Sequence, residues 1–520
     1  MDLGEGQRHV KPRDKSRFAA APEVVNSQND GVSEQRDLRA PSRAFIAAAF
    51  DVLSEQHVIP TPIFHPFVAV GRDYVGDSIM ALAEYHALEA QLNDAYPERF
   101  AEPLKRRHAE FASTYMFSLL EACVARCARD RSFDADGQAV DKSIDELLAV
   151  LGTTTYEVVC CRHVSHLTTT SGAEVQIGDV TVVPEPEQWG GLVDRIQHEI
   201  RGAARAWNRD HPRPYDPPHS LLITREVTDD PEPYEVGDRL SGRLERFLLL
   251  ARLLTAGTVQ SAYEVSGTTT LVARLDPLMS TFLKGRLDTL VRRTVRLTGD
   301  EGAAFGALGG LIDDADVKRE GMVATSFDVA LSKFNRSHSS ASPYEHLVDL
   351  ATALEAALIG AEKETEGLTL RLRARVAALL ATDNDSARAL FDDVGQLYNL
   401  RSKLVHGGQI KQKELRRIIA RISTVPADAP EHRFGVALGH AVDRMRDLVR
   451  RAILARLCLA AEPGPLWPFV GDIAVDATLA DDTKRAAWRG RWHERLAALG
   501  VEYAAGPPRS AVDFLSQEDR

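Results

Sequence analysis

The feature that most constrains the fold is a series of five segments with helical apolar spacing between residues 344 and 459. In the first, residues 344–359, Leu347, Leu350, Leu354 and Leu358 recur at steps of three and four, which places them on one face of a helix. The other four segments are residues 368–380, 385–406, 413–422 and 436–459. Because their connections are short, neighbouring helices should run antiparallel. The pattern therefore predicts an antiparallel all-α bundle.

The third of these helices has two recognisable ends. Asp385 is a candidate N-cap, because a short carboxylate can accept hydrogen bonds from the first free amides of a helix. At the other end Gly407 and Gly408 favour the left-handed backbone that stops a helix. We therefore expect the helix to run from about residue 385 to His406.

The whole chain has 520 residues, too many for one hydrophobic core. Strand-like, β-branched segments begin near residue 152 and alternate with helical ones, and Gly178-Asp179 marks a turn between two strands. The expected class is a multidomain, mainly α protein with an α+β middle region and a C-terminal antiparallel all-α bundle. The expected parts are a disordered segment at 1–40, a helical region at 41–150, an α+β region at 151–320, the bundle at 321–462, and a tail with a short helix at 463–520.

Composition limits the surroundings and the partners of the chain. The longest apolar run, residues 247–256, is interrupted by Arg252 and is too short to span a bilayer. Five scattered cysteines favour reduced thiols, so we expect a cytoplasmic protein that binds no membrane. The net charge is −12, but residues 320–460 hold 20 Lys plus Arg against 17 Asp plus Glu, a local excess of +3. Any binding of nucleic acid is therefore expected in that segment.

One Arg-x4-His motif, Arg401 to His406, stands in the third predicted helix. This spacing is common by chance, so its position is what makes it informative. Leu390, Val394, Leu397 and Leu404 form an apolar stripe, and steps of four and three place Arg401 on it. A guanidinium on a core-facing stripe is costly unless it is paired or used.

The residues 397–408, Leu-Tyr-Asn-Leu-Arg-Ser-Lys-Leu-Val-His-Gly-Gly, resemble the signature of the HEPN superfamily, in particular its ApeA-like branch. Residues 350–358, with Ala-Leu-Glu at their centre, resemble the first core helix of that branch, and 371–380 resembles the helix between. The similarity covers about residues 325–460. It implies a HEPN-like helical domain.

The resemblance also implies a function. Many HEPN proteins are metal-independent ribonucleases in which the Arg–His motifs of two protomers meet in a dimer. His406 would then act as general acid or base and Arg401 would stabilise charge on the phosphate, with Ser402 and Glu355 as supporting residues. No cofactor or metal is expected. The branch suggests a role in phage defence or stress-induced growth arrest, with residues 41–320 sensing an unknown trigger or gating the site.

Basic residues follow the motif. Lys413, Arg417 and Arg421 lie at steps of four, opposite Ile418, Ile419 and Ile422. With Lys403 and Lys411 they would track an RNA backbone. The other interpretation is the solvated face of a surface helix.

Two further functions stay open at this point. The Arg401–His406 pair could be structural, with Arg401 held by Asp392, Asp393 or Glu355 in a non-catalytic dimerisation or binding module. A hydrolase built on the α+β region, using carboxylates or His163, is the third interpretation. The segment 160–166 also contains metal-ligand residue types, but a half-buried strand explains it more simply.

Overall fold

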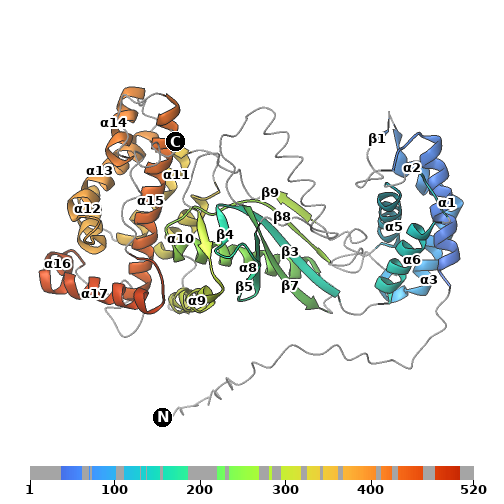
Figure 1. Ribbon diagram of the computed structural model, residues 1–520, viewed down its shortest axis with the longest axis horizontal. Coiled ribbons are helices and arrows are strands. Elements are labelled where there is room, and N and C mark those ends of the chain that lie inside the picture. Colours follow the sequence, from blue (N-terminus) through green and yellow to red (C-terminus); the bar gives the residue numbers. More distant parts are fainter. Residues whose placement is uncertain are drawn as a thin grey trace, which may run out of the picture.

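The computed structural model describes residues 37–60, 69–70, 73–100, 111–128, 131–135, 137–152, 156–184, 219–228, 233–268, 280–283, 294–317, 325–339, 343–360, 367–405, 411–423, 431–460 and 475–503. The fold is mainly helical, with one antiparallel sheet between two groups of helices (Figure 1). This confirms the expected fold class. Residues 1–36 of the predicted disordered segment lie outside the described residues, and the first helix already begins at Arg39, before the predicted end of that segment at residue 40.

The N-terminal helical unit comprises residues 37–152 and has a hydrophobic core of its own. Phe45, Met116 and Leu147 are among its fully buried side chains. Figure 1 shows this group, in blue to teal, at one end of the molecule. Its elements are α1 (Arg39–Glu55), β1 (Ala69–Val70), β2 (Asp73–Tyr74), α2 (Val75–Met80), α3 (Ala83–Ala95), α4 (Pro97–Phe100), α5 (Ala112–Cys127) and α6 (Gln138–Leu151).

The sheet unit, residues 156–317, contains a six-stranded sheet of order β5-β6-β7-β3-β8-β9 in which neighbours are antiparallel. The predicted turn at Gly178 is confirmed: with φ of 58°, it joins β5 to β6. The strands are β3 (Tyr156–Ser165), β5 (Val175–Ile177), β6 (Val180–Pro184), β7 (His219–Thr228), β8 (Gln260–Thr268) and β9 (Ser280–Leu283); β4 (Leu167–Thr169) and β10 (Val295–Leu297) form a separate parallel pair.

Helix α8 (Pro233–Leu254) covers one face of this sheet and packs on β3 and β7. Val158, Cys160 and Val164 alternate along β3 and join Leu240 and Leu244 of α8 in one core, as the period of two in a strand requires. Helix α9 (Gly302–Val317) follows a short 3-10 turn (Gly299–Glu301) and packs against α8.

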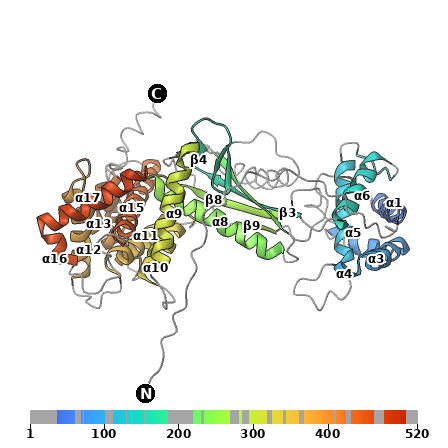
Figure 2. The ribbon, with the colours of Figure 1, turned by 90° about the horizontal axis from the view of Figure 1, so that it is seen from below.

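The C-terminal helices confirm the bundle expected from the apolar spacing. They are α10 (Ser326–Arg336), α11 (Pro343–Leu358), α12 (Leu368–Leu380), α13 (Ala387–Val405), α14 (Gln412–Ser423), α15 (Glu431–Ala460), α16 (Val475–Ala480) and α17 (Asp482–Ala498). Helix α15 is central: it contacts α10, α11, α12, α14 and α17 of the bundle, and also α8 and α9. Figure 2 shows α15 and α17 beside α9 at the boundary with the sheet unit.

The sheet unit and the bundle share one hydrophobic core. It extends from Val158 in the sheet through Leu448 of α15 to Trp492 of α17. The N-terminal core is a separate cluster. Within the described residues, no helix is both long and apolar enough to cross a membrane.

One predicted boundary needs correction. Helix α13 begins at Ala387, where the hydroxyl of Ser386 accepts a hydrogen bond from the amide of Ala389 at 3.2 Å. Asp385, predicted as the N-cap, is buried instead, and its carboxylate binds two arginines of α15. The predicted stop at Gly407-Gly408 lies outside the described residues.

Candidate functional site

Arg401 stands in the last turns of α13, at the edge of the predicted apolar stripe. Leu390, Val394 and Leu397 are buried as expected, and Leu400 is buried beside them. The side chain of Arg401 is 25% exposed, although the Nε of its guanidinium is buried. The side chain of Leu404 lies outside the described residues.

Two side chains surround the Arg401 guanidinium. Glu355 comes from α11, and Tyr398 lies one helical turn before Arg401 on α13. The Tyr398 hydroxyl donates a hydrogen bond to Glu355 Oε2 at 2.9 Å, and the same oxygen lies 4.0 Å from Arg401 Nη2. The guanidinium carbon is 5.4 Å from the centre of the Tyr398 ring. The packing of α11 against α13 thus brings a carboxylate, a phenol and a guanidinium together.

The surroundings of Tyr398 affect the protonation of its phenol. Burial, aided by the hydrogen bond to Glu355 and by its charge, raises the pKa of Tyr398 to about 12. The phenol therefore stays protonated and acts as a donor near neutral pH. Its hydrogen bond fixes the orientation of the Glu355 carboxylate, which leaves that carboxylate facing Arg401.

Arg401 is only loosely paired within the described part of the chain. Its buried Nε has no hydrogen-bond partner there, and 4.0 Å to Glu355 is too long for a hydrogen bond. The two aspartates considered as partners bind other arginines: Asp392 accepts from Arg388 at 2.7 Å, and Asp393 accepts from Arg444 at 3.0 Å. A guanidinium in this state has donors available for an anionic ligand.

The remaining residues of the predicted site are only partly described. Ser402 is partly buried, next to Arg401 on α13. His406 lies outside the described residues, so its distance from Arg401 stays a prediction. Sequence reasoning had not assigned Tyr398 a role, although its spacing of three from Arg401 is the signal that placed it beside the guanidinium.

The predicted basic stripe lies on the exposed side of α14. Lys413, Arg417 and Arg421 are exposed, and we refer to them as the α14 basic face. Ile418, Ile419 and Ile422 are buried on the opposite side, as expected.

The two other predicted RNA-binding lysines differ from each other. Lys411 is exposed just before α14. Lys403 forms an ion pair with Glu414, which links α13 to α14 and holds the pKa of Glu414 below its ordinary value. The charge of Lys403 is thus partly compensated.

The metal-ligand residue types of β3 are dispersed. Cys160 and Cys161 are buried thiols on opposite faces of the strand, and neither is in a disulfide. His163 stacks on His219 with ring centres 4.9 Å apart, and burial lowers the pKa of His163 to about 3. Among the described residues, no group of three or more His, Cys, Asp or Glu side chains is arranged to bind a metal.

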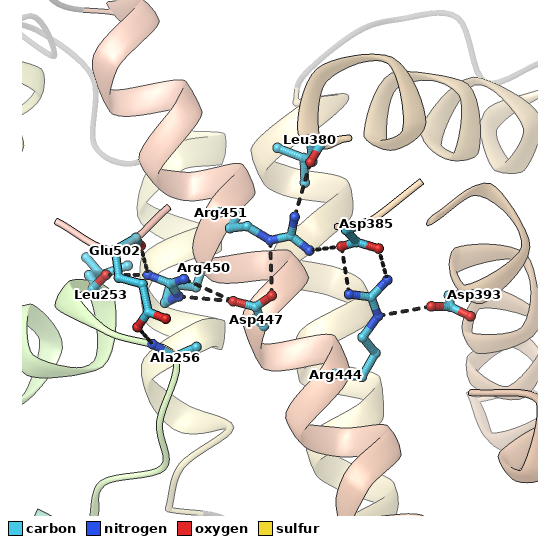
Figure 3. Close-up of polar contacts among 10 residues, drawn as sticks. All are labelled: Leu253, Ala256, Leu380, Asp385, Asp393, Arg444, Asp447, Arg450, Arg451 and Glu502. Carbon is cyan, nitrogen blue, oxygen red and sulfur yellow. Dashed lines mark hydrogen bonds and ion pairs between the residues drawn. The ribbon is translucent and has the colours of Figure 1, made fainter. Parts of the chain in front are cut away.

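A second polar cluster, which sequence reasoning missed, lies on α15. Arg444, Arg450 and Arg451 are buried, and their carboxylate partners are Asp385, Asp393 and Asp447 (Figure 3). We call these six residues the α15 arginine network. The sequence did contain a signal for this network: the predicted helix at 436–459 has apolar residues on all sides and yet contains closely spaced arginines.

No family model, no curated protein and no solved structure matches this chain. The similarity to HEPN domains therefore rests on the sequence of residues 350–358, 371–380 and 397–408 alone.

Proposed function

We propose that this protein is a metal-independent endoribonuclease of the HEPN type, with Arg401 and His406 at its site. The observation that carries the proposal is the state of Arg401. Its guanidinium stands at the exposed edge of α13, beside Tyr398 and Glu355, with a buried Nε that lacks a hydrogen-bond partner in the described structure. An arginine that is positioned by its neighbours but has unused hydrogen-bond donors suits a phosphate, because a phosphate offers two or more oxygens to a planar guanidinium.

The chemistry requires no metal, because RNA supplies the nucleophile. The 2′-hydroxyl attacks the adjacent phosphorus, the bond to the 5′-oxygen breaks, and the products are a 2′,3′-cyclic phosphate and a 5′-hydroxyl. His406 would move a proton to the leaving oxygen or from the attacking one, a contribution of about 10²- to 10⁴-fold. Arg401 would stabilise the charge on the phosphorane. Glu355 would hold Arg401, and Ser402 would orient the phosphate.

The α14 basic face supports RNA as the ligand. Its three exposed cations follow one side of a helix that is next to α13 in the chain and packs against it. Together with Lys411, and with Lys403 where Glu414 releases it, this face would bind the phosphates that flank the cleaved bond.

The wider proposal follows the same resemblance. The protein would act in the cytoplasm as a homodimer through the bundle, so that the Arg401 and His406 residues of two protomers meet. Residues 41–320 would sense a trigger or gate the site, in phage defence or in stress-induced growth arrest.

RNA cleavage by the purified full chain tests the proposal. Wild type, Arg401→Ala and His406→Ala are compared with EDTA present, and Arg388→Ala serves as the matched control. Arg388 is on the same helix, but its side chain is 85% exposed and pairs with Asp392. Cleavage that survives EDTA, persists in Arg388→Ala and disappears in the other two variants is the expected result.

A gated enzyme needs a second assay, because it can be inactive without its trigger. Expression in cells provides one: wild type should arrest growth, and the Arg401→Ala and His406→Ala variants should not. If wild type neither cleaves RNA nor harms cells more than the two variants do, the nuclease proposal is wrong.

A non-catalytic dimerisation or binding module is the second candidate. The observation that favours it is that Glu355 lies within 4.0 Å of Arg401 in the same chain, as a structural pair would. If the protein is such a module, the His406→Ala variant should bind RNA or a partner with the same affinity as wild type. Neither wild type nor any variant should then release a cyclic phosphate.

A further inference from the structure

The α15 arginine network contacts the sheet unit through Arg450. Its guanidinium donates to the carbonyl of Leu253 in the last turn of α8 at 3.2 Å, and to the carbonyl of Glu502. Glu502 is itself fastened to the same place: its amide donates to the Leu254 carbonyl at 3.2 Å, and its carboxylate accepts from the Ala256 amide at 3.3 Å. Arg450 therefore holds the carboxyl end of α8 (Figure 3).

On its other side the network contacts the helix that carries Arg401. Arg451 donates to the Leu380 carbonyl at the end of α12 at 3.1 Å, and to Asp385. Arg444 binds both oxygens of Asp385 at 2.7 and 2.8 Å, and Asp393 of α13 at 3.0 Å. Arg401 lies about two turns further along α13 than Asp393.

Asp447 joins the two sides. One of its oxygens accepts from Arg450 Nη2 at 3.0 Å, and the other forms an ion pair with Arg451 Nε at 3.0 Å. Among the side chains of the network, Asp393 is the most exposed, at 15%, and the others are at most 6% exposed. Three arginines thus face three aspartates in a buried, neutral chain of contacts that runs from α8 to α13.

The α15 arginine network resists movement of α8, α13 and α15 relative to one another. A buried guanidinium cannot leave its carboxylate without exposing an unpaired charge to a medium of low dielectric constant. Apolar side chains of equal volume would stabilise the same contact, but they hold no fixed donor and acceptor geometry. The network therefore sets the register of α8, α15 and α13 more strictly than packing alone.

We propose that the α15 arginine network couples the sheet unit to α13, so that a change at the carboxyl end of α8 alters the placement of Arg401. The coupling stands on these contacts alone. Only its consequence for catalysis rests on the proposed nuclease function, and the test below uses no RNA.

Hydrogen exchange of the full chain at increasing denaturant measures the coupling. The variants are Arg450→Met, which removes the link to α8, and Arg444→Met, which weakens only the α13 side. Both are buried arginines of one helix, so each controls for the other. In Arg444→Met the slowest amides of α13 should lose protection, and those of α8 should lose it with them. The reason is that Arg450, Asp447 and Arg451 still connect α8 to Asp385, which lies two residues before α13.

In Arg450→Met, hydrogen exchange in α8 should no longer follow hydrogen exchange in α13. The carboxyl end of α8 should exchange about tenfold faster relative to α13 than it does in wild type, a ratio typical of residues in one ion-pair network. The proposal is overturned if Arg444→Met leaves α8 unchanged, or if Arg450→Met accelerates α8 and α13 equally. Should Arg450→Met not fold, Arg450→Lys replaces it, because lysine keeps the charge near Asp447 but cannot hold both carbonyls.

Discussion

The strongest consequence of the buried charges concerns Asp385. Its carboxylate is 1% exposed and accepts two hydrogen bonds from Arg444, at 2.7 and 2.8 Å, and one from Arg451. Asn is nearly the same size, but it carries no charge and directs an amide group at one of the guanidinium groups. Asp385→Asn therefore removes the shared counter-charge of two buried arginines while leaving the packing intact.

The expected cost is about 3 kcal/mol at neutral pH. Removing one partner of a buried ion pair destabilises a protein by about 3–5 kcal/mol. The lower end applies, because Arg444 keeps Asp393 at 3.0 Å and Arg451 keeps Asp447 at 3.0 Å. A domain of roughly 200 residues loses about 2–4 °C of melting temperature per kcal/mol, so we expect a decrease of about 6 °C or somewhat more.

The cost should also depend on pH, with a sign that the structure defines. Burial raises the pKa of Asp385, but the hydrogen bonds and charges of Arg444 and Arg451 outweigh it, so the folded-state pKa lies below the ordinary value. The stabilisation is then present above the unfolded-state pKa of about 4 and disappears as the pH falls through the folded-state pKa. The difference between wild type and Asp385→Asn should shrink in acid.

Urea denaturation, followed by the fluorescence of the buried Trp488 and Trp492, provides the assay. The control is Asp383→Asn, because Asp383 lies two residues away and is exposed. We expect this control to change the free energy of unfolding by less than about 0.5 kcal/mol. Equal, small effects of the two variants, or a cost of Asp385→Asn that does not fall in acid, would refute the reasoning.

Three further predictions use other parts of the molecule. Gly360 has φ of 70°, and a Cβ there would lie 3.1 Å from Ser326 Oγ, so Gly360→Ala should destabilise the protein by about 1–2 kcal/mol in chemical denaturation. Gly310 is inside α9, and a Cβ added there would have no neighbour within 4 Å apart from the adjacent residues and backbone of its own helix, so Gly310→Ala should stabilise the protein by about 0.5–1 kcal/mol. Replacing the three residues of the α14 basic face by glutamines should make the plot of log binding constant against log salt concentration less steep for single-stranded RNA. The slope should change by about 2, because each of the three lost phosphate contacts contributes about 0.7, and an unchanged slope would mean that RNA binds elsewhere. Burial raises the pKa of Cys123, Cys161 and Cys458 to about 12 each, so these thiols should resist iodoacetamide at pH 8 until the chain is unfolded by urea, and rapid alkylation of the native protein would contradict the burial.

The sequence alone predicted the helices of the bundle well. The segment 368–380 has the bounds of α12, and three other predicted segments begin and end within a few residues of α11, α13 and α14. Helix α15 was the exception, because it begins at Glu431, five residues earlier than expected, where polar residues and Gly435 give no apolar period. Periodicity is local information: it records which side of a helix avoids water, and it needs no knowledge of the partner.

The sequence also placed Arg401 on the apolar stripe of α13, but it did not identify the neighbours of its guanidinium. Glu355 had been one of three candidate partners, and only the packing of α11 against α13 separated it from Asp392 and Asp393. Even when the buried face of a helix is known, an arginine on it has several possible carboxylate partners, because flexible acidic side chains extend in several directions. The choice depends on how helices far apart in the chain pack together.

The arginines of α15 and the role of Asp385 depended on the tertiary structure entirely. By residue type, Asp385 is a good N-cap and arginines belong on a surface. Asp385 lies 59 and 66 residues from the two arginines that it binds, and no local pattern connects them. Burying these charges is tolerable only where carboxylates and carbonyls from α8, α12 and α13 converge on α15, and that convergence is a property of the folded chain.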